Sequence, residues 1–328
     1  MDYKQYIMPT IVLLTVAFLY ENYKQYNEDD ENAKHYKMVE KYLLNSSSLA
    51  RSKKPILWIY TDREINARWW ASWGSRNTEC MNQPYQFLTI KSIIDKCGGN
   101  FNICLIDDST FENIIPGWNI EIEKIADPIK NKIINLAMAK ILKLYGGLIV
   151  PSSFICFRSL IKLYKAGLKK TGMFVGEIEP RDGKGPPKSQ PYQDIACPSP
   201  YFMGCVKNSY KMNEYIDFLL KMISNDYTAE SIFLGEIAEW LAFNIDKGEI
   251  NVIPAEMLGS RDEKNKLITI EQLMGNSFIN VSSAAVGVYL PDKDILRRTK
   301  YQWFARLSTT QAISSDTMAG KILMLANS

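Results

Sequence analysis

Carboxylates dominate the chemistry open to this chain, because histidine is nearly missing from it. The one histidine, His35, lies in a polar stretch ahead of the apolar part of the sequence. A Ser-His-Asp triad, a Cys-His pair and a His-ligated zinc site are therefore excluded from the main domain. Acidic side chains beside apolar runs or in polar loops could instead act as general base or nucleophile. These are Asp62, Asp107, Asp108, Glu177 and Asp194.

For Asp107 and Asp108 a structural role competes with catalysis. Both follow the apolar run FNICLI, and Asp108-Ser109 precedes a short predicted helix. Aspartate in such places commonly caps a helix or closes a turn, because its side chain accepts backbone N–H hydrogen bonds. The sequence leaves both interpretations open.

A tryptophan-rich segment offers a stacking surface. Trp69, Trp70 and Trp73 fall within RWWASWGSRN, where small and polar residues indicate a loop. Aromatic rings stack on nucleobases and sugars, so this segment could bind either, with Arg76 beside it; the alternative is that the tryptophans anchor a core. Other cations that could stabilise a leaving group electrostatically are Arg63, Arg68, Arg181, Lys184 and Lys188.

Charge and cysteine content narrow the function further. Lysine and arginine total 39 against 36 aspartates and glutamates, without long basic blocks, so no nucleic-acid partner is expected. The 6 cysteines form no C-x-x-C pair, and we expect buried free thiols rather than a zinc site.

The apolar patterns predict an α/β fold that would position these residues. Strands alternate with helices, an order that favours an open, mostly parallel sheet with helices on both faces. Ligands bind beyond the carboxyl ends of strands in such sheets, which selects Asp62, Asp107, Asp108 and the turn at residues 151–153. Strands are predicted at 55–61, 101–106, 148–150, 173–178 and 201–206, with short ones at 250–254 and 287–291, and helices at 83–97, 127–145, 213–223 and 229–246.

The N-terminus carries a candidate membrane anchor. Residues 6–20 contain no charge and are bracketed by tyrosines, as at a bilayer interface. Such a helix spans only about 22 Å, so flanking side chains would have to snorkel. A cleaved signal peptide and a helix packed on the domain are the alternatives. With Lys4 before the run and acidic residues after it, the positive-inside rule places the C-terminal domain in the lumen or exterior, as a single-pass membrane protein.

Residues 134–160, INLAMAKILKLYGGLIVPSSFICFRSL, resemble the core of the capsular-polysaccharide-synthesis and DXD sugar-binding glycosyltransferase families. Their usual pattern is S-D-x-x-R-x-x-x-L-x-x-x-G-G-x-x-x-D-x-D, and Leu142, Gly146 and Gly147 match it. The resemblance implies a glycosyltransferase A-type, Rossmann-like domain and a nucleotide-sugar site that includes Gly146, Gly147, Ser152 and Ser153. The wider pattern, with WWASWGSRNTE, is similar to glycosyltransferase-like proteins encoded by large double-stranded DNA viruses.

The chain departs from this pattern at its charged positions. Asn135 and Met138 stand where the family has Asp and Arg, and Pro151 and Ser153 replace the two aspartates of the acidic motif. Mg²⁺ and Mn²⁺ need hard oxygen ligands, which proline lacks. The acidic motif is therefore degenerate, and we expect no metal cofactor unless an acidic site is rebuilt from elsewhere in the chain.

Together these patterns predict a membrane-anchored glycosyltransferase-like protein that serves as a binding or structural module, with a sugar nucleotide or glycan as ligand. An active, metal-independent hexosyl-type transferase is the first alternative, and a structural membrane protein of a virion is the second. The expected organisation is an anchor with its flanks at 1–27, a stalk at 28–53, the α/β domain at 54–250 and a C-terminal extension packed on it at 251–328.

Overall fold

A computed structural model of the chain describes residues 54–61, 83–178, 197–225 and 230–328. One compact unit comprises Lys53–Phe111 and Ile120–Ser328, and residues 112–119 belong to a second unit. The fold described below is that of the larger unit. The expected anchor at 6–20, the stalk, His35 and Cys80 lie outside the described residues. Within the described part of the chain, no helix is both long and apolar enough to cross a membrane.

The centre of the unit is a six-stranded sheet in the order β2-β1-β3-β6-β5-β7. β6 runs antiparallel to its neighbours β3 and β5, and the other strand pairs are parallel. This confirms the predicted α/β class with a mostly parallel sheet. The strands are β1 (Ile56–Tyr60), β2 (Asn102–Ile106), β3 (Gly147–Ile149), β5 (Met173–Glu177), β6 (Pro198–Cys205) and β7 (Asn251–Ile253).

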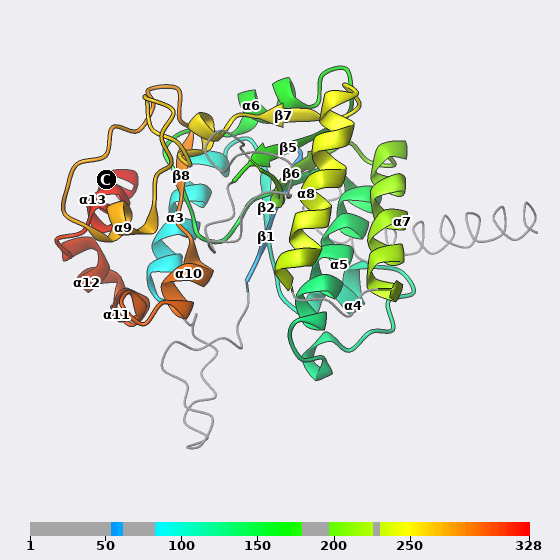
Figure 1. Cartoon of the computed structure of the whole chain (residues 1–328), viewed down its shortest axis with the longest axis horizontal. Helices are drawn as coiled ribbons and strands as arrows, with labels where there is room; N and C mark the ends of the chain where they lie inside the picture. The colour runs from blue at the N-terminus through cyan, green and yellow to red at the C-terminus, as the bar shows by residue number, and fades with distance from the viewer. Residues whose placement is uncertain (1–53, 62–82, 179–196, 226–229) are drawn as a thin grey trace, which may run out of the picture. The chain divides into compact units, whose positions relative to one another are not determined.

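Helices flank both faces of this sheet, as the sequence predicts. α3 (Tyr85–Cys97) and α6 (Ile161–Gly167) cover one face. α5 (Ile129–Tyr145), α7 (Tyr210–Asn225) and α8 (Glu230–Asp246) lie side by side on the other, with α5 and α8 in contact with β6 (Figure 1). Shorter elements are α4 (Thr110–Ile114), η3 (Ile122–Lys124) and η4 (Ala255–Leu258).

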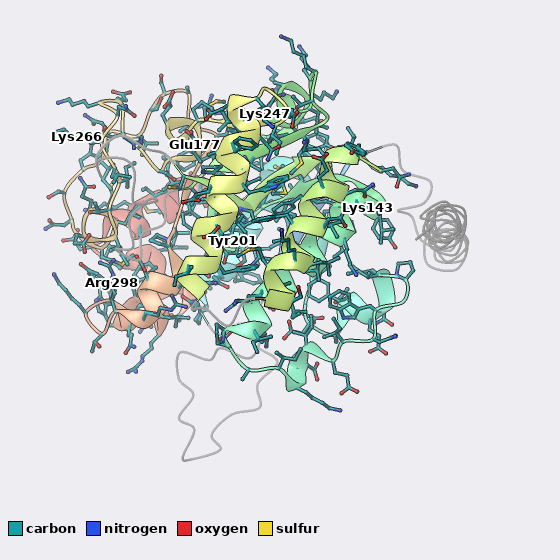
Figure 2. The ribbon with its side chains drawn as sticks, turned by 45° about the vertical axis from the view of Figure 1, so that its right-hand side comes forward. Lys143, Glu177, Tyr201, Lys247, Lys266 and Arg298 are labelled. Carbon is teal, nitrogen blue, oxygen red and sulfur yellow. The ribbon has the colours of Figure 1, made fainter. Side chains whose placement is uncertain are left out.

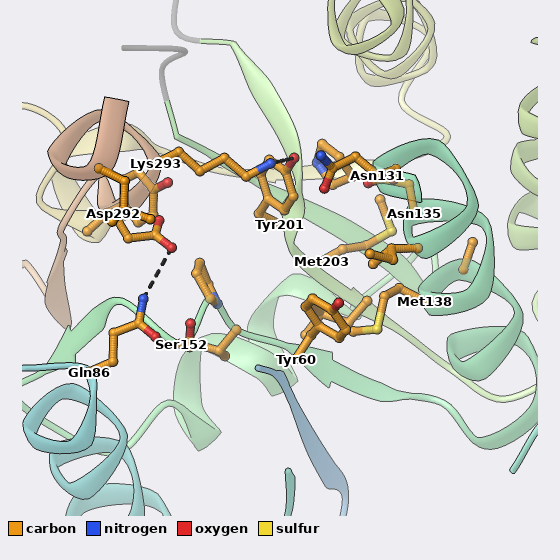
Figure 3. A pocket seen from close by; sticks show the side chains of 18 of the residues that line it. Tyr60, Gln86, Asn131, Asn135, Met138, Ser152, Tyr201, Met203, Asp292 and Lys293 are labelled. Atoms are coloured by element: carbon orange, nitrogen blue, oxygen red, sulfur yellow. Dashed lines mark hydrogen bonds between the residues drawn. The ribbon is translucent and has the colours of Figure 1, made fainter. Parts of the chain in front are cut away.

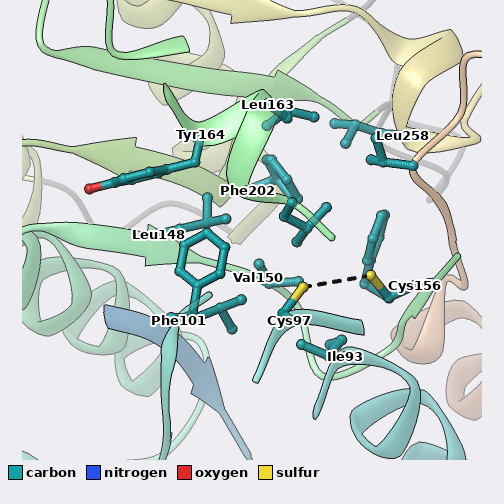
Figure 4. Packing of buried hydrophobic residues seen from close by; sticks show 14 of the residues in the cluster. Ile93, Cys97, Phe101, Leu148, Val150, Cys156, Leu163, Tyr164, Phe202 and Leu258 are labelled. Carbon is teal, nitrogen blue, oxygen red and sulfur yellow. Dashed lines mark hydrogen bonds between the residues drawn. The ribbon is translucent and has the colours of Figure 1, made fainter. Parts of the chain in front are cut away.

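The first hydrophobic core lies between the sheet and the face that carries α3 and α6. Leu148, Val150 and Phe202 point into it from the strands, as Figure 4 shows, and are at most 1% exposed. Their alternation with outward-pointing neighbours follows the period of two of a strand. Cys97 and Cys156 also lie here as free thiols, with their sulfur atoms 3.9 Å apart. The free thiols Cys197 and Cys205 are buried as well, and that of Cys104 is half-buried.

The C-terminal segment builds a second core on α3. Tyr85 and Leu88 of α3 pack with Phe304 and Leu323, all of them buried. β8 (Gly287–Tyr289) pairs with β4 (Phe154–Cys156) in a separate two-stranded sheet, while β7 belongs to the main sheet. The extension is thus tied to the rest of the unit by strands as well as by helices. Its helices are α9 (Ile270–Met274), α10 (Asp292–Arg297), α11 (Gln302–Ala305), α12 (Thr309–Ser314) and α13 (Met318–Asn327).

Candidate functional site

A cavity of about 280 Å³ lies at the carboxyl ends of β1 and β3. Tyr60 ends β1, Pro151 and Ser152 follow β3, and Tyr201 comes from the first half of the antiparallel strand β6. α5 forms one wall and α10 the opposite wall, with the start of α3 on the same side as α10 (Figure 3). This is the edge of a parallel sheet at which ligands usually bind.

The positions at which the chain departs from the glycosyltransferase pattern meet at this cavity. Asn135 and Met138 line it from α5, and Pro151 lines it from the turn after β3. Ser153 is fully buried behind this turn, and its hydroxyl donates a hydrogen bond of 3.3 Å to Asp292, which lines the cavity. Thr89 of α3 donates to the carbonyl of Ser152 and so ties the turn to α3.

Asp292 is a cavity residue that the sequence argument missed. Its Oδ2 accepts a hydrogen bond of 3.3 Å from Gln86 Nε2 (Figure 3), and its Oδ1 accepts the one from Ser153. Burial raises the pKa of the Asp292 carboxyl, against the opposing effect of Lys293 and of hydrogen bonds from the backbone and Ser153. No local pattern marks Asp292, because it follows the antiparallel strand β8 outside the main sheet and meets Gln86 and Ser153 only through the fold.

A cation lies next to this carboxylate on the same helix. Lys293 Nζ donates a 3.2 Å hydrogen bond to the Tyr201 hydroxyl and lies 5.2 Å from the centre of its ring. Arg297, one helical turn further along α10, also lines the cavity. The α10 wall can therefore attract an anionic group and accept hydrogen bonds from hydroxyl groups at the same time.

The described residues provide little for a metal ion. Asp292 and Asp127 are the acidic side chains on the cavity wall, and Asp127 accepts a 2.7 Å hydrogen bond from Asn131. In the described part of the chain, no three or more histidine, cysteine, aspartate or glutamate side chains cluster so as to hold a metal ion. A divalent cation beside Asp292 would also face the Lys293 ammonium.

Asp108, a candidate catalytic residue, is instead part of a buried ion pair. Its Oδ2 lies 2.7 Å from Lys130 Nζ, and the two side chains are 9% and 8% exposed. Its Oδ1 accepts a 2.6 Å hydrogen bond from the Tyr60 hydroxyl. Asp108 is not among the residues that line the cavity. It positions Tyr60, which does line it.

Asp107 and Glu177 have structural contacts. Asp107 Oδ1 accepts hydrogen bonds from Ser109 Oγ at 2.8 Å and from the backbone N–H of Thr110 at 3.1 Å, which closes the turn before α4. Glu177 accepts a 3.1 Å hydrogen bond from the backbone N–H of Ala255 at the start of η4. Neither lines the cavity, so the structure gives no support to a catalytic role for them.

The double glycine also lies outside the cavity. Gly146 accepts a 2.9 Å hydrogen bond from the indole N–H of Trp58, and a Cβ on Gly147 would come within 2.3 Å of the Ile56 carbonyl oxygen. Both glycines have positive φ, of 70° and 111°. They let β3 approach β1 closely at its amino end, and the structure places Ser152, not these glycines, at the cavity.

The remaining sequence candidates fall outside the described residues. They are Asp62, Trp69, Trp70, Trp73, Arg76 and Asp194, together with Arg63, Arg68, Arg181, Lys184 and Lys188. Among described cations, Lys247 and Lys266 lie on the exposed outer surface, well apart from each other (Figure 2).

Comparison with known proteins adds no relative. No model of a known protein family matches the chain, and no curated protein is significantly similar to it. The fold and the cavity define an α/β protein with a mostly parallel sheet and a ligand-sized cavity at the carboxyl edge of that sheet.

Proposed function

We propose that this chain is a glycosyltransferase-like protein whose cavity binds a sugar nucleotide or related glycan without a divalent metal. One observation carries the proposal. Asn135, Met138 and Pro151 were singled out by alignment to the glycosyltransferase pattern, and all three line one cavity, with Ser153 bonded to a fourth lining residue.

The charges on the α10 wall support the metal-free part of the proposal. Lys293 and Arg297 can neutralise a diphosphate in the way a metal ion does in other transferases. The tyrosine rings of Tyr60, Tyr201 and Tyr289 supply flat apolar surfaces that suit a base or a sugar ring. In this proposal residues 6–20 anchor the domain to a membrane.

A second candidate function is metal-independent transfer, and Asp292 is the observation that favours it. A carboxyl group whose pKa is raised by burial is a stronger base once it is ionised. In such a transferase Asp292 would accept the proton of the attacking hydroxyl. An active transferase would release nucleoside diphosphate from a bound donor, and Asp292→Asn would lose this release. A binding module would release none.

The proposal is tested by thermal shift of the full chain in a mild detergent. UDP-, GDP- and CMP-sugars are each added with and without Mn²⁺, because a ligand that binds only the native state raises the melting temperature. We expect a rise with at least one donor that is independent of Mn²⁺. Lys293→Met should abolish the rise, whereas the control Lys266→Met, at an exposed lysine outside the cavity, should retain it.

Two results would contradict the proposal. A rise that requires Mn²⁺ would mean that an acidic metal site is rebuilt elsewhere in the chain. The absence of a rise with any donor would favour a structural role, including that of a virion membrane protein.

A further inference from the structure

Tyr215 is a buried tyrosine that lines the α5 side of the cavity. The side chain is 1% exposed and lines the cavity from α7, which packs against α5. Its ring packs on Trp240 with the ring centres 5.3 Å apart. Its hydroxyl is sealed from solvent and has no hydrogen-bond partner among the described residues. A buried hydroxyl without a partner is destabilising, so this group requires another reason to be present.

The cavity around Tyr215 is mainly apolar. Figure 3 shows Met138 and Met203 together on the α5 side, across the cavity from Asp292 and Gln86. The Asn135 side-chain amide, which lines the cavity from α5, donates a 2.8 Å hydrogen bond to the Asn131 carbonyl. Burial raises the pKa of the Tyr215 hydroxyl, which therefore stays protonated and able to donate. The Tyr215 hydroxyl is thus a donor without a partner among the described residues, and apolar side chains lie beside it at this end of the cavity.

These surroundings suit one kind of sugar substituent better than another. A sugar hydroxyl placed here would bury its own polar group against methionine and isoleucine side chains, which is unfavourable. An acetamido group carries a methyl group for the apolar wall and a carbonyl oxygen for a single donor. Methionine side chains are unbranched, so Met138 and Met203 can adjust to admit it.

We propose that Tyr215 is the specificity-determining residue for an N-acetylated sugar, donating its hydroxyl hydrogen to the acetamido carbonyl while Met138 and Met203 contact the methyl group. The inference rests on the proposed function, since it names the sugar class taken by the same cavity. It predicts that N-acetylglucosamine is preferred over glucose, both as the free sugar and as the UDP-sugar.

The experiment compares two tyrosine-to-phenylalanine variants of the full chain. Tyr215→Phe removes only the unpaired hydroxyl. Tyr164→Phe is the matched control, because Tyr164 is also a buried tyrosine, lies outside the cavity, and has its hydroxyl bonded to the backbone of Gly147. Without ligand, Tyr215→Phe should melt at the same or a higher temperature than the native chain, whereas Tyr164→Phe should melt lower.

Binding is then read by saturation-transfer NMR with N-acetylglucosamine, glucose and their UDP conjugates. We expect the acetyl methyl resonance to receive the strongest saturation in the native chain and in Tyr164→Phe. Tyr215→Phe should lose at least about tenfold in affinity for the N-acetylated sugars, corresponding to about 1.4 kcal/mol, and bind the glucose compounds unchanged.

The outcomes separate the two proposals. Equal binding of acetylated and plain sugars, or an unchanged preference in Tyr215→Phe, would overturn the role of Tyr215 and leave the sugar-nucleotide site standing. If neither these sugars nor any nucleotide sugar of the thermal-shift panel binds the native chain, the proposed function and this inference fall together.

Discussion

Asp292 is held at the cavity by partners that precede it by 206 and 139 residues, Gln86 and Ser153. Ser153 lies in the turn after β3, so helix α10 brings a carboxylate to this turn from far along the chain. One carboxylate beside a lysine cannot replace a metal site, but it can bind hydroxyl groups. We therefore expect the Asp292 carboxylate to favour ligand binding while it lowers the stability of the folded chain.

Asp292→Asn should stabilise the chain at about pH 7. Burial raises the folded-state pKa above its ordinary value of 3.8, so the folded state binds more protons than the unfolded state between the two pKa values. The native chain therefore loses stability as pH rises through that window, and the loss is complete above the folded-state pKa. Melting curves should show the advantage of the variant at neutral pH and its disappearance in acid.

The pH dependence distinguishes this effect from a general change in packing. Asp316→Asn is the control, because the Asp316 carboxyl pairs with Lys321 and its pKa is lowered by that lysine. That variant should not gain stability at neutral pH. An Asp292→Asn chain that melts below the native chain at every pH would show that the carboxylate stabilises the fold.

Sequence alone could identify some cavity residues and not others. Asn135, Met138 and Pro151, which line the cavity, stand in one continuous segment with Ser153 behind them, so a single pattern finds them. Asp292 could be recognised only through contacts across most of the chain. Tyr215 was hidden for a different reason, since on an amphipathic helix a buried tyrosine cannot be told from an ordinary core residue.

At the scale of elements, the close approach of β3 to β1 depends on Gly147. Gly147→Ala should cost at least about 2 kcal/mol of unfolding free energy, because φ of 111° is strained for alanine and the new Cβ would clash with a backbone oxygen. Gly99→Ala is the control, because a Cβ there meets nothing within 4 Å. Denaturant titration should separate the two variants, and equal stability would contradict the close-approach argument.

Long elements follow from the sequence better than short ones do. Residues 127–145 predict α5, which spans Ile129–Tyr145, because many turns of apolar periodicity fix the helix type. β4 and α6 are not predicted, since a strand such as Phe154–Cys156 is too short to show a period. The direction of β6 is also beyond sequence reasoning, because strand direction depends on pairing partners and not on the pattern within the strand.

At the scale of the whole unit, α3 joins the two cores. Ile93 and Cys97 belong to the first, and Tyr85 and Leu88 to the second.

Phe304→Ala should cost about 3–5 kcal/mol of unfolding free energy, the usual range for a buried phenylalanine. Because the Phe304 ring lies 5.2 Å from that of Tyr85, hydrogen exchange should accelerate in α3 as well as in α11 and α13. Acceleration confined to the C-terminal helices would show that they form an independent unit. Exposed Trp303 is the control position, and its replacement by alanine should leave α3 protected.

The chain order of the cavity has a consequence for biosynthesis. The sheet is complete once β7 has left the ribosome, yet Asp292 and Lys293 emerge about forty residues later. A nascent chain can therefore complete its main sheet before it can hold a ligand on the α10 wall. Any stabilisation through the α10 wall reaches only chains synthesised beyond α10, so the main sheet must fold without it.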